Sequence, residues 1–142
     1  MKLFVVSVGK IKERRLREVA DEYLARIQRY VACEEVETRD APSLERAIPR
    51  EAFVVALEVD GEAMTSEGFA HRLERWASRG KGRVAFVVGG AEGIPPALSR
   101  AADARLSLST LTLSHRLARV VLLEQLYRAM TILRGEPYAR EG

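Results

Sequence analysis

Hydrophobic and polar positions in this chain follow two alternating periods. Short apolar runs typical of strands occur at Leu3–Val8, Phe53–Val59 and Val84–Val88, and weaker ones at Glu35–Thr38 and Arg105–Leu108. The longer segments between them place apolar residues at helical spacing. Strand and helix alternate five times along the chain. This order predicts an α/β fold with a mostly parallel sheet and helices on both of its faces.

Capping and turn signals bound the expected helices. We expect helices over Leu16–Ile27, from Ser43 to Ile48, from Thr65 or Ser66 to just before Gly80, from Pro95 to about Ala102, and from Ser114 to about Leu133. Asp60-Gly61 reads as a turn, and Gly135 suits the position after the last helix. That last helix is apolar nearly all round, so it needs burial on more than one side. A second subunit could supply one of those sides, which is our hypothesis of a homodimer.

Length and composition bound the class of protein. The 142 residues are expected to form one domain, 1–142, and 47% hydrophobic with 30% charged residues excludes a disordered chain. Cys33 is the single cysteine, which excludes an internal disulfide, and with two histidines a metal site is unexpected. The apolar runs are too short for a membrane span, and the start is too briefly apolar for a signal peptide. We therefore expect a cytoplasmic protein without a membrane or metal partner.

Charge is divided unevenly along the chain. Residues 1–30 hold eight basic and four acidic residues, 31–70 hold three and ten, and 71–142 hold twelve and six. A fold that gathers the basic stretches on one face could bind a phosphate backbone. Charge alone favours the simpler interpretation, which is solvated helix faces.

Two loops at predicted strand ends are candidates for a binding site. Gly89-Gly90-Ala91-Glu92-Gly93 follows a buried strand, but its spacing matches neither a dinucleotide fingerprint nor a Walker loop. The segment Leu108–His115 alternates leucines with hydroxyl residues, a composition that suits an adenine ring. Ligands of parallel sheets bind beyond the carboxyl ends of the strands. We therefore expect a site formed by the loops after Val59, Val88 and Leu108, although a tight turn and a helix cap would explain these residues equally well.

Other chemistry receives little support. The chain has no G-x-S-x-G or H-E-x-x-H motif. Glu34 and Glu35 follow Cys33 and should raise its thiol pKa, which argues against a nucleophilic thiolate. Glu34, Glu35 and Glu37 are interpreted as a solvated strand or loop, and Trp76 as a core residue.

Five segments in one order resemble a known family. They are Lys2–Gly9, Gly89–Gly93, Ser107–His115, the run from Arg119 through Glu124 to Ala129, and the ending Pro137-Tyr138. Together, over essentially the whole chain, they resemble the ribosomal RNA large subunit methyltransferase H family, the pseudouridine N3-methyltransferases of the SPOUT superfamily. Each motif alone is weak, but their joint order and the matching length are specific.

The resemblance implies a fold, a cofactor and partners. The C-terminal segment would be threaded into a trefoil knot, and the protein would be a homodimer that uses S-adenosylmethionine to methylate a pseudouridine of large-subunit (23S) rRNA in the assembled ribosome. By similarity, the donor pocket would be formed by Leu57, Gly89, Gly90, Leu108, Ser109, Thr110, Leu111, Thr112 and Leu113.

The resemblance also suggests roles for basic and aromatic residues. Arg119 and Arg128 are expected to orient the base or phosphates, because a cationic donor would repel them. Arg116 and Arg140 are further candidates for RNA contact. Tyr138 and Arg140 are expected to close over the target, with His115 at the rim.

One position departs from the family. The family usually ends Pro-Tyr-His followed by a basic residue, whereas Ala139 stands here in place of the histidine. We infer that this histidine has a positional role, or that water or His115 accepts the proton. The departure also permits a catalytically inactive RNA-binding dimer, and a third alternative is an enzyme for a small nucleotide with the glycine loop as its phosphate site.

Overall fold

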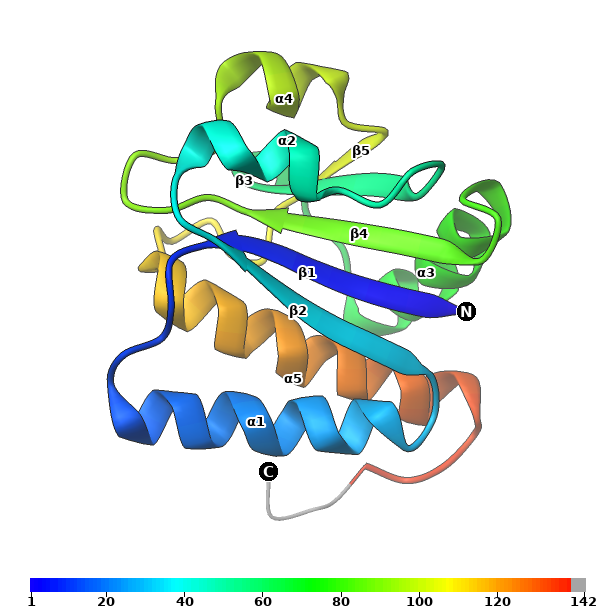
Figure 1. Ribbon diagram of the computed structural model, residues 1–142. Coiled ribbons are helices and arrows are strands. Elements are labelled where there is room, and N and C mark those ends of the chain that lie inside the picture. Colours follow the sequence, from blue (N-terminus) through cyan, green and yellow to red (C-terminus); the bar gives the residue numbers. More distant parts are fainter. Residues whose placement is uncertain (139–142) are drawn as a thin grey trace.

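A parallel five-stranded sheet forms the centre of the molecule in the computed structural model, which describes residues 1–138 (Figure 1). The strands are β1 (Lys2–Val8), β2 (Ala32–Thr38), β3 (Phe53–Glu62), β4 (Arg83–Val88) and β5 (Ala104–Leu106). Their order across the sheet is β2-β1-β4-β3-β5, and every neighbouring pair is parallel. The predicted α/β class and parallel sheet are confirmed.

Helices cover both faces of this sheet, also as predicted. They are α1 (Arg14–Gln28), α2 (Leu44–Ala47), α3 (Ser66–Arg79), α4 (Pro96–Ala101) and α5 (His115–Leu133), with a 3₁₀ turn at Ala41–Ser43 before α2. The long helices α1, α3 and α5 lie on one face, and the short helices α2 and α4 lie on the other (Figure 1). The result is a three-layer α/β sandwich.

Alternate strand residues divide the core into two clusters. Leu3 and Val5 of β1 pack toward the long helices, whereas Phe4 and Val6 pack toward the short ones. The larger cluster contains Trp76, 5% exposed, whose ring stacks on Phe53 at a centroid distance of 5.7 Å. The interpretation of Trp76 as a core residue is thus confirmed.

The single cysteine belongs to the same larger cluster. Cys33 is 5% exposed in β2. Burial, and secondarily the carboxylate of Glu35, raises the pKa of its thiol to about 12. The expected direction is confirmed, but burial has a larger effect than the neighbouring charges.

Helix α5 is enclosed on three sides, which explains its apolar residues nearly all round. It packs against α1 and α3 at its flanks and on the sheet beneath, with Leu122, Leu123 and Leu126 fully buried. Ser114 caps its start, because its Oγ accepts the Leu117 N–H at 3.3 Å. At its end, the N–H groups of Gly135 and Glu136 donate to the carbonyls of Ile132 and Thr131, so the predicted stop is confirmed. The neighbouring helices therefore provide burial that the sequence left open to a second subunit.

Two local predictions were wrong. Asp60-Gly61 does not end its strand: β3 continues to Glu62, and the Ser107 N–H donates to the Glu62 carbonyl at 2.9 Å. A Cβ on Gly61 would lie 2.8 Å from backbone atoms of Leu106, so glycine allows this close approach of β3 to β5. Ser43 does not cap α2, because the Asp40 side chain accepts the Ser43 N–H and caps the preceding turn instead.

The expected trefoil knot stays a prediction.

Within the described part of the chain, no helix has the length and apolar character needed to cross a bilayer.

Candidate donor-binding site

A cavity of about 390 Å³ opens where β4 and β5 end and α5 begins, beside residues 57–59 of β3. This volume is within the range of roughly 300–1,000 Å³ that small-molecule sites occupy. Two of the three loops singled out from the sequence converge here: Gly89 and Gly90 follow β4, and the segment after β5 forms a wall. In place of the expected loop after Val59, the strand residues Leu57, Glu58 and Val59 of β3 line the cavity. Within the segment after β5, Leu108, Ser109, Leu111, Thr112 and Leu113 line the cavity, whereas Thr110 does not.

Close packing within the loop Gly89–Gly93 explains why a glycine is needed there. A Cβ on Gly89 would lie 2.5 Å from the carbonyl carbon of Gly93, so even alanine would force this loop to shift. The Gly93 N–H donates to the Gly90 carbonyl at 3.0 Å, which closes the turn. Glycine at position 89 is therefore required by the turn itself, before any ligand approaches.

Hydrogen bonds between residues close in sequence fix the conformation of the segment after β5. The Ser107 hydroxyl donates to the Ser109 carbonyl at 3.0 Å, and the Leu111 N–H donates to the Ser109 Oγ at 2.9 Å. These bonds hold the backbone in a turn that leaves the Leu111 side chain 75% exposed beside the cavity. Such a leucine offers apolar contact area to a flat ring.

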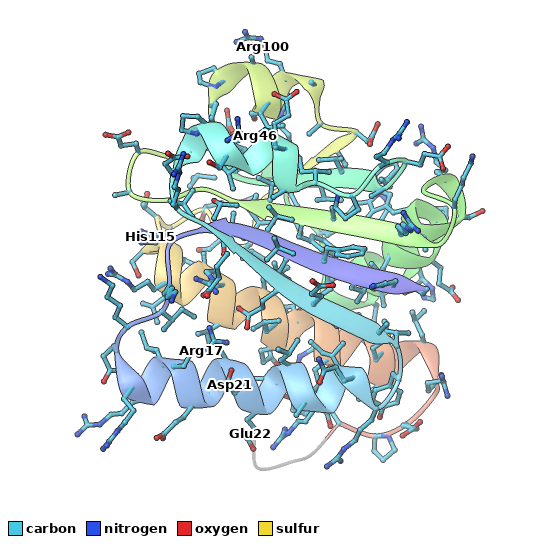
Figure 2. The ribbon with its side chains drawn as sticks, in the orientation of Figure 1. Arg17, Asp21, Glu22, Arg46, Arg100 and His115 are labelled. Carbon is cyan, nitrogen blue, oxygen red and sulfur yellow. The ribbon has the colours of Figure 1, made fainter. Side chains whose placement is uncertain are left out.

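His115 lies at the first position of α5 and lines the cavity (Figure 2). Burial lowers the pKa of its imidazole, and the nearby charges of Arg116 and Arg119 lower it further. The ring is therefore uncharged at neutral pH. Of the residues predicted to act catalytically that lie within 1–138, His115 is the one that the structure brings to this cavity.

Arg119, one turn further along α5, is a buried structural residue. Its side chain is 1% exposed, and its guanidinium donates to Glu35 at 2.8 Å, to Glu37 at 2.6 Å and to the Gly9 carbonyl at 3.1 Å. These bonds join α5 to β2 and to the loop after β1. Because the guanidinium of Arg119 is not accessible to a ligand in this arrangement, we do not propose Arg119 as an RNA contact.

The acidic residues of β2 are correspondingly less solvated than expected. The side chains of Glu35 and Glu37 are 9% and 26% exposed. Arg17 of α1 also pairs with both carboxylates. Part of the charge division along the sequence is thus neutralised inside the fold, because acidic β2 lies against basic positions of α1 and α5.

Arg128 and Tyr138 lie at the opposite end of α5. Arg128 pairs with Glu124 at 2.8 Å, and its guanidinium lies 4.0 Å from the centre of the Tyr138 ring. Burial, with Tyr23 and Glu124 nearby, raises the pKa of the Tyr138 phenol, so this hydroxyl stays protonated. Thirteen residues separate His115 from Arg128, which at 1.5 Å per residue is about 20 Å along the helix. Within one chain, the expected catalytic residues are therefore divided between two places.

Two further arginines were expected to contact RNA. Arg116 is exposed on the first turn of α5, directly beside His115. Arg140, like the departure at Ala139, lies outside the described residues.

Glu58 is a cavity residue that sequence reasoning missed. It follows Leu57 in β3, lines the cavity, and accepts a hydrogen bond from the Ser99 Oγ of α4 at 2.5 Å. Its place at the carboxyl end of a buried strand was a usable signal. Within residues 1–138, no group of three or more His, Cys, Asp and Glu side chains is arranged to hold a metal ion.

Solved structures share this architecture at low sequence identity. A probable methylase family protein from Haemophilus influenzae Rd KW20 superposes with a TM-score of 0.57 at 9% identity, over 98% of this chain and 70% of that one. TrmJ from Z. mobilis ZM4 superposes with a TM-score of 0.56 at 12% identity, over 99% of this chain and 72% of that one. The chain therefore shares its α/β fold with these two proteins.

Sequence comparison identifies the family. The family described as "Predicted SPOUT methyltransferase" matches residues 1–139. Ribosomal RNA large subunit methyltransferase H of Sorangium cellulosum is 59% identical over 98% of this chain and 99% of its own length. The protein of the same name from Anaeromyxobacter dehalogenans is 44% identical over 97% and 99%. The chain belongs to the SPOUT methyltransferase family, and within it to the group of ribosomal RNA large subunit methyltransferase H.

Proposed function

We propose that this protein transfers a methyl group from S-adenosylmethionine to N3 of a pseudouridine in large-subunit (23S) rRNA, within the assembled ribosome. The observation that carries this proposal is the cavity at the ends of β4 and β5, beside residues 57–59 of β3, in a chain of this family. Its leucines offer apolar area to adenine, and its turns offer backbone N–H and carbonyl groups. Ribosomes are cytoplasmic, and we place the protein there too.

The residues present fit such a donor. When bound, the donor supplies an electrophilic methyl group on a sulfonium. Leu57 of β3 and Leu111 of the segment after β5 both border the cavity and can contact a planar ring, while Glu58 and the neutral His115 are its titratable side chains among the described residues. No lysine or arginine lines the cavity among the described residues, which suits a cationic ligand.

Transfer to N3 requires loss of the N3 proton, because that nitrogen is otherwise not nucleophilic. His115 is uncharged at neutral pH and lies at the cavity, so its ring can accept this proton directly or through water. Ala139 replaces the histidine that is usual in the family, which makes His115 or a water the remaining candidates. The rest of the barrier is lowered by alignment of donor and nitrogen.

Two copies of the chain complete the site in this proposal. Arg128 lies about 20 Å from His115 along α5, with the Tyr138 ring against its guanidinium, and this is too far for the pair to act at the cavity of their own chain. A homodimer in which one copy presents this end of α5 to the partner's cavity brings them together. Leu111 and Leu117, 75% and 44% exposed near the cavity, provide apolar surface that such a contact could cover.

Exposed basic residues beside the cavity suit an RNA backbone. Arg116 adjoins His115, and the bond from Arg119 to the Gly9 carbonyl holds the loop after β1 against this end of α5. Phosphate contacts of this kind position a nucleic acid and depend on salt. The exposed basic side chains of that loop and of the first turn of α1 are Lys10, Lys12, Arg14 and Arg15.

The test of the activity is transfer of labelled methyl from S-adenosylmethionine to ribosomes that lack the modification, followed by nucleoside mapping. Label in N3-methylpseudouridine of the large subunit supports the proposal. Donor binding without any transfer would instead favour an inactive RNA-binding dimer. Transfer to free nucleotides in preference to ribosomes would favour a small-nucleotide enzyme.

Mixed dimers test the shared site. Gly89→Ala disrupts the cavity loop, and Arg128→Ala removes the group at the far end of α5, so each homodimer should be inactive. A mixture of the two should recover up to about a quarter of wild-type activity, because each mixed dimer has one intact site. Failure of the mixture to recover, with subunit exchange demonstrated, would show that each chain acts alone.

A further inference from the structure

The donor cavity contains a single carboxyl group. Among the described residues that line it, Glu58 is the one acidic side chain and His115 the one imidazole. Leu57, Ile94 and Leu106 form apolar wall nearby. A charge beside such a wall is screened less than a charge in open water.

The carboxylate of Glu58 in β3 is held in place by a serine of helix α4. The Ser99 hydroxyl donates to its Oε2 at 2.5 Å, and Ser99 itself is 8% exposed in α4. A serine hydroxyl on a charged acceptor makes a strong hydrogen bond. This bond fixes the negative charge in β3, directly after the residues of β3 that pair regularly with β4 and β5.

Among the described residues that line the cavity, none places a positive charge opposite this carboxylate at neutral pH. Burial and the neighbouring arginines lower the pKa of His115, so its ring is neutral. Arg116 is exposed to solvent, and the Arg119 guanidinium is already paired with Glu35 and Glu37. The cavity therefore carries a net negative charge.

We propose that Glu58 is a specificity-determining residue that makes the cavity bind the methyl donor more tightly than the product of transfer. This inference rests on the proposed function. The sulfonium of S-adenosylmethionine is positive; when its methyl leaves, the sulfur keeps the bonding pair and becomes a neutral thioether in S-adenosylhomocysteine. The adenosine and amino acid parts are the same in both. A fixed carboxylate therefore favours the donor through charge alone and lets the spent cofactor leave.

Calorimetry with both ligands on the full-length protein tests this inference. In the Glu58→Gln variant, which keeps the size and the hydrogen bond to Ser99, donor affinity should fall about tenfold and product affinity less than about threefold. The preference should also weaken with added salt in the wild type. Glu45→Gln is the matched control, because it removes a carboxylate from an exposed position of α2 and should alter neither affinity.

Two other variants separate charge from structure. Glu58→Asp keeps the charge, so it should retain most of the preference even if its contacts loosen. Ser99→Ala leaves the carboxylate unfixed and should give a loss between wild type and Glu58→Gln. Circular dichroism would establish that all variants are folded.

The outcomes distinguish this inference from the function beneath it. An equal loss for donor and product in Glu58→Gln would mean that the carboxylate contacts a part common to both, and would overturn the inference while leaving the function intact. Unchanged affinities would overturn it as well. Wild-type protein that binds neither ligand would contradict the proposed function itself.

Discussion

Two arginines of α5 occupy opposite environments, although they are nine positions apart in one helix. Arg119 is 1% exposed and bonds to two carboxylates and a backbone carbonyl. Arg128 is 33% exposed, has one carboxylate partner on its own helix, and lies over an aromatic ring. The first therefore connects three parts of the fold, whereas the second is available to a ligand or a partner.

The difference between Arg119 and Arg128 shows that a sequence motif alone does not decide whether an arginine binds a ligand or stabilises the fold. Both arginines were expected to contact RNA or base from the sequence. What separates them is the carboxylates that each one meets, and for Arg119 these come from β2, more than eighty residues earlier. A buried charge needs such partners, because leaving either side unpaired is costly.

The largest effect is expected from Arg119→Gln. This change leaves the Glu35 and Glu37 carboxylates without their buried partner, and should lower the free energy of unfolding by about 3 kcal/mol. Urea denaturation measures this loss. Arg128→Gln is the matched control and should cost less than about 1 kcal/mol, because its ion pair is partly exposed. Equal midpoints for the two variants would abolish the distinction.

Arg128→Ala should instead damage the reaction. We expect methyl transfer to fall about a hundredfold, since loss of one orienting group at a reacting centre has effects of this size. The urea midpoint should remain near that of the wild type. Normal turnover by this variant on ribosomes would remove Arg128 from the site.

Tyr138 should show a smaller effect that depends on its ring. Tyr138→Ala removes the surface beneath the Arg128 guanidinium and should lower transfer about tenfold, in keeping with a cation–π contact of 1–2 kcal/mol. Tyr138→Phe keeps the ring and should stay within about twofold. The raised pKa of the phenol means that no ionisation of Tyr138 should appear in the pH profile below its ordinary value of 10. A loss in Phe as large as in Ala would make the hydroxyl the important group.

The smallest effect is expected at the other end of α5, from protonation of His115. Its pKa is lowered from 6.5 in the fold, so the unfolded chain binds the proton first as pH falls. Stability from the neutral ring is therefore present above about pH 6.5 and is lost as pH decreases through the folded-state pKa. Donor affinity should decline a few-fold over the same window, because an imidazolium repels a cation. Calorimetry on His115→Gln should give a flatter profile, and an identical decline would point to another group.

Local pattern was sufficient for much of the fold. The buried runs at Phe53 and Val84 begin within a residue of the observed strands, and Ser114 caps α5 as expected. The wrong prediction at Asp60-Gly61 arises where distant backbone intervenes. The strand continues through Gly61 because β5 lies against it. The residues Asp60-Gly61 alone do not indicate that β5 is their neighbour.

The site was predictable in its loops but not in its charges. Gly89, Leu57 and Leu111 converge because parallel strands end at one edge of a sheet. The partly buried carboxylate of Glu35 in β2 depends on Arg17 of α1 and Arg119 of α5. The sequence around Glu35 does not indicate these partners, so it favoured a solvated strand. Glu58 was missed since its role depends on Ser99 of α4, a contact between residues far apart in sequence.

The buried thiol of Cys33 has a practical consequence for spectroscopy. Only the ionised form of a thiol reacts readily with alkylating dyes, and a pKa of about 12 leaves very little of it at neutral pH. A cysteine engineered at an exposed position would therefore be labelled selectively, with the native residue left in place. Fluorophores attached in this way could follow how two copies approach each other without any change to the hydrophobic interior.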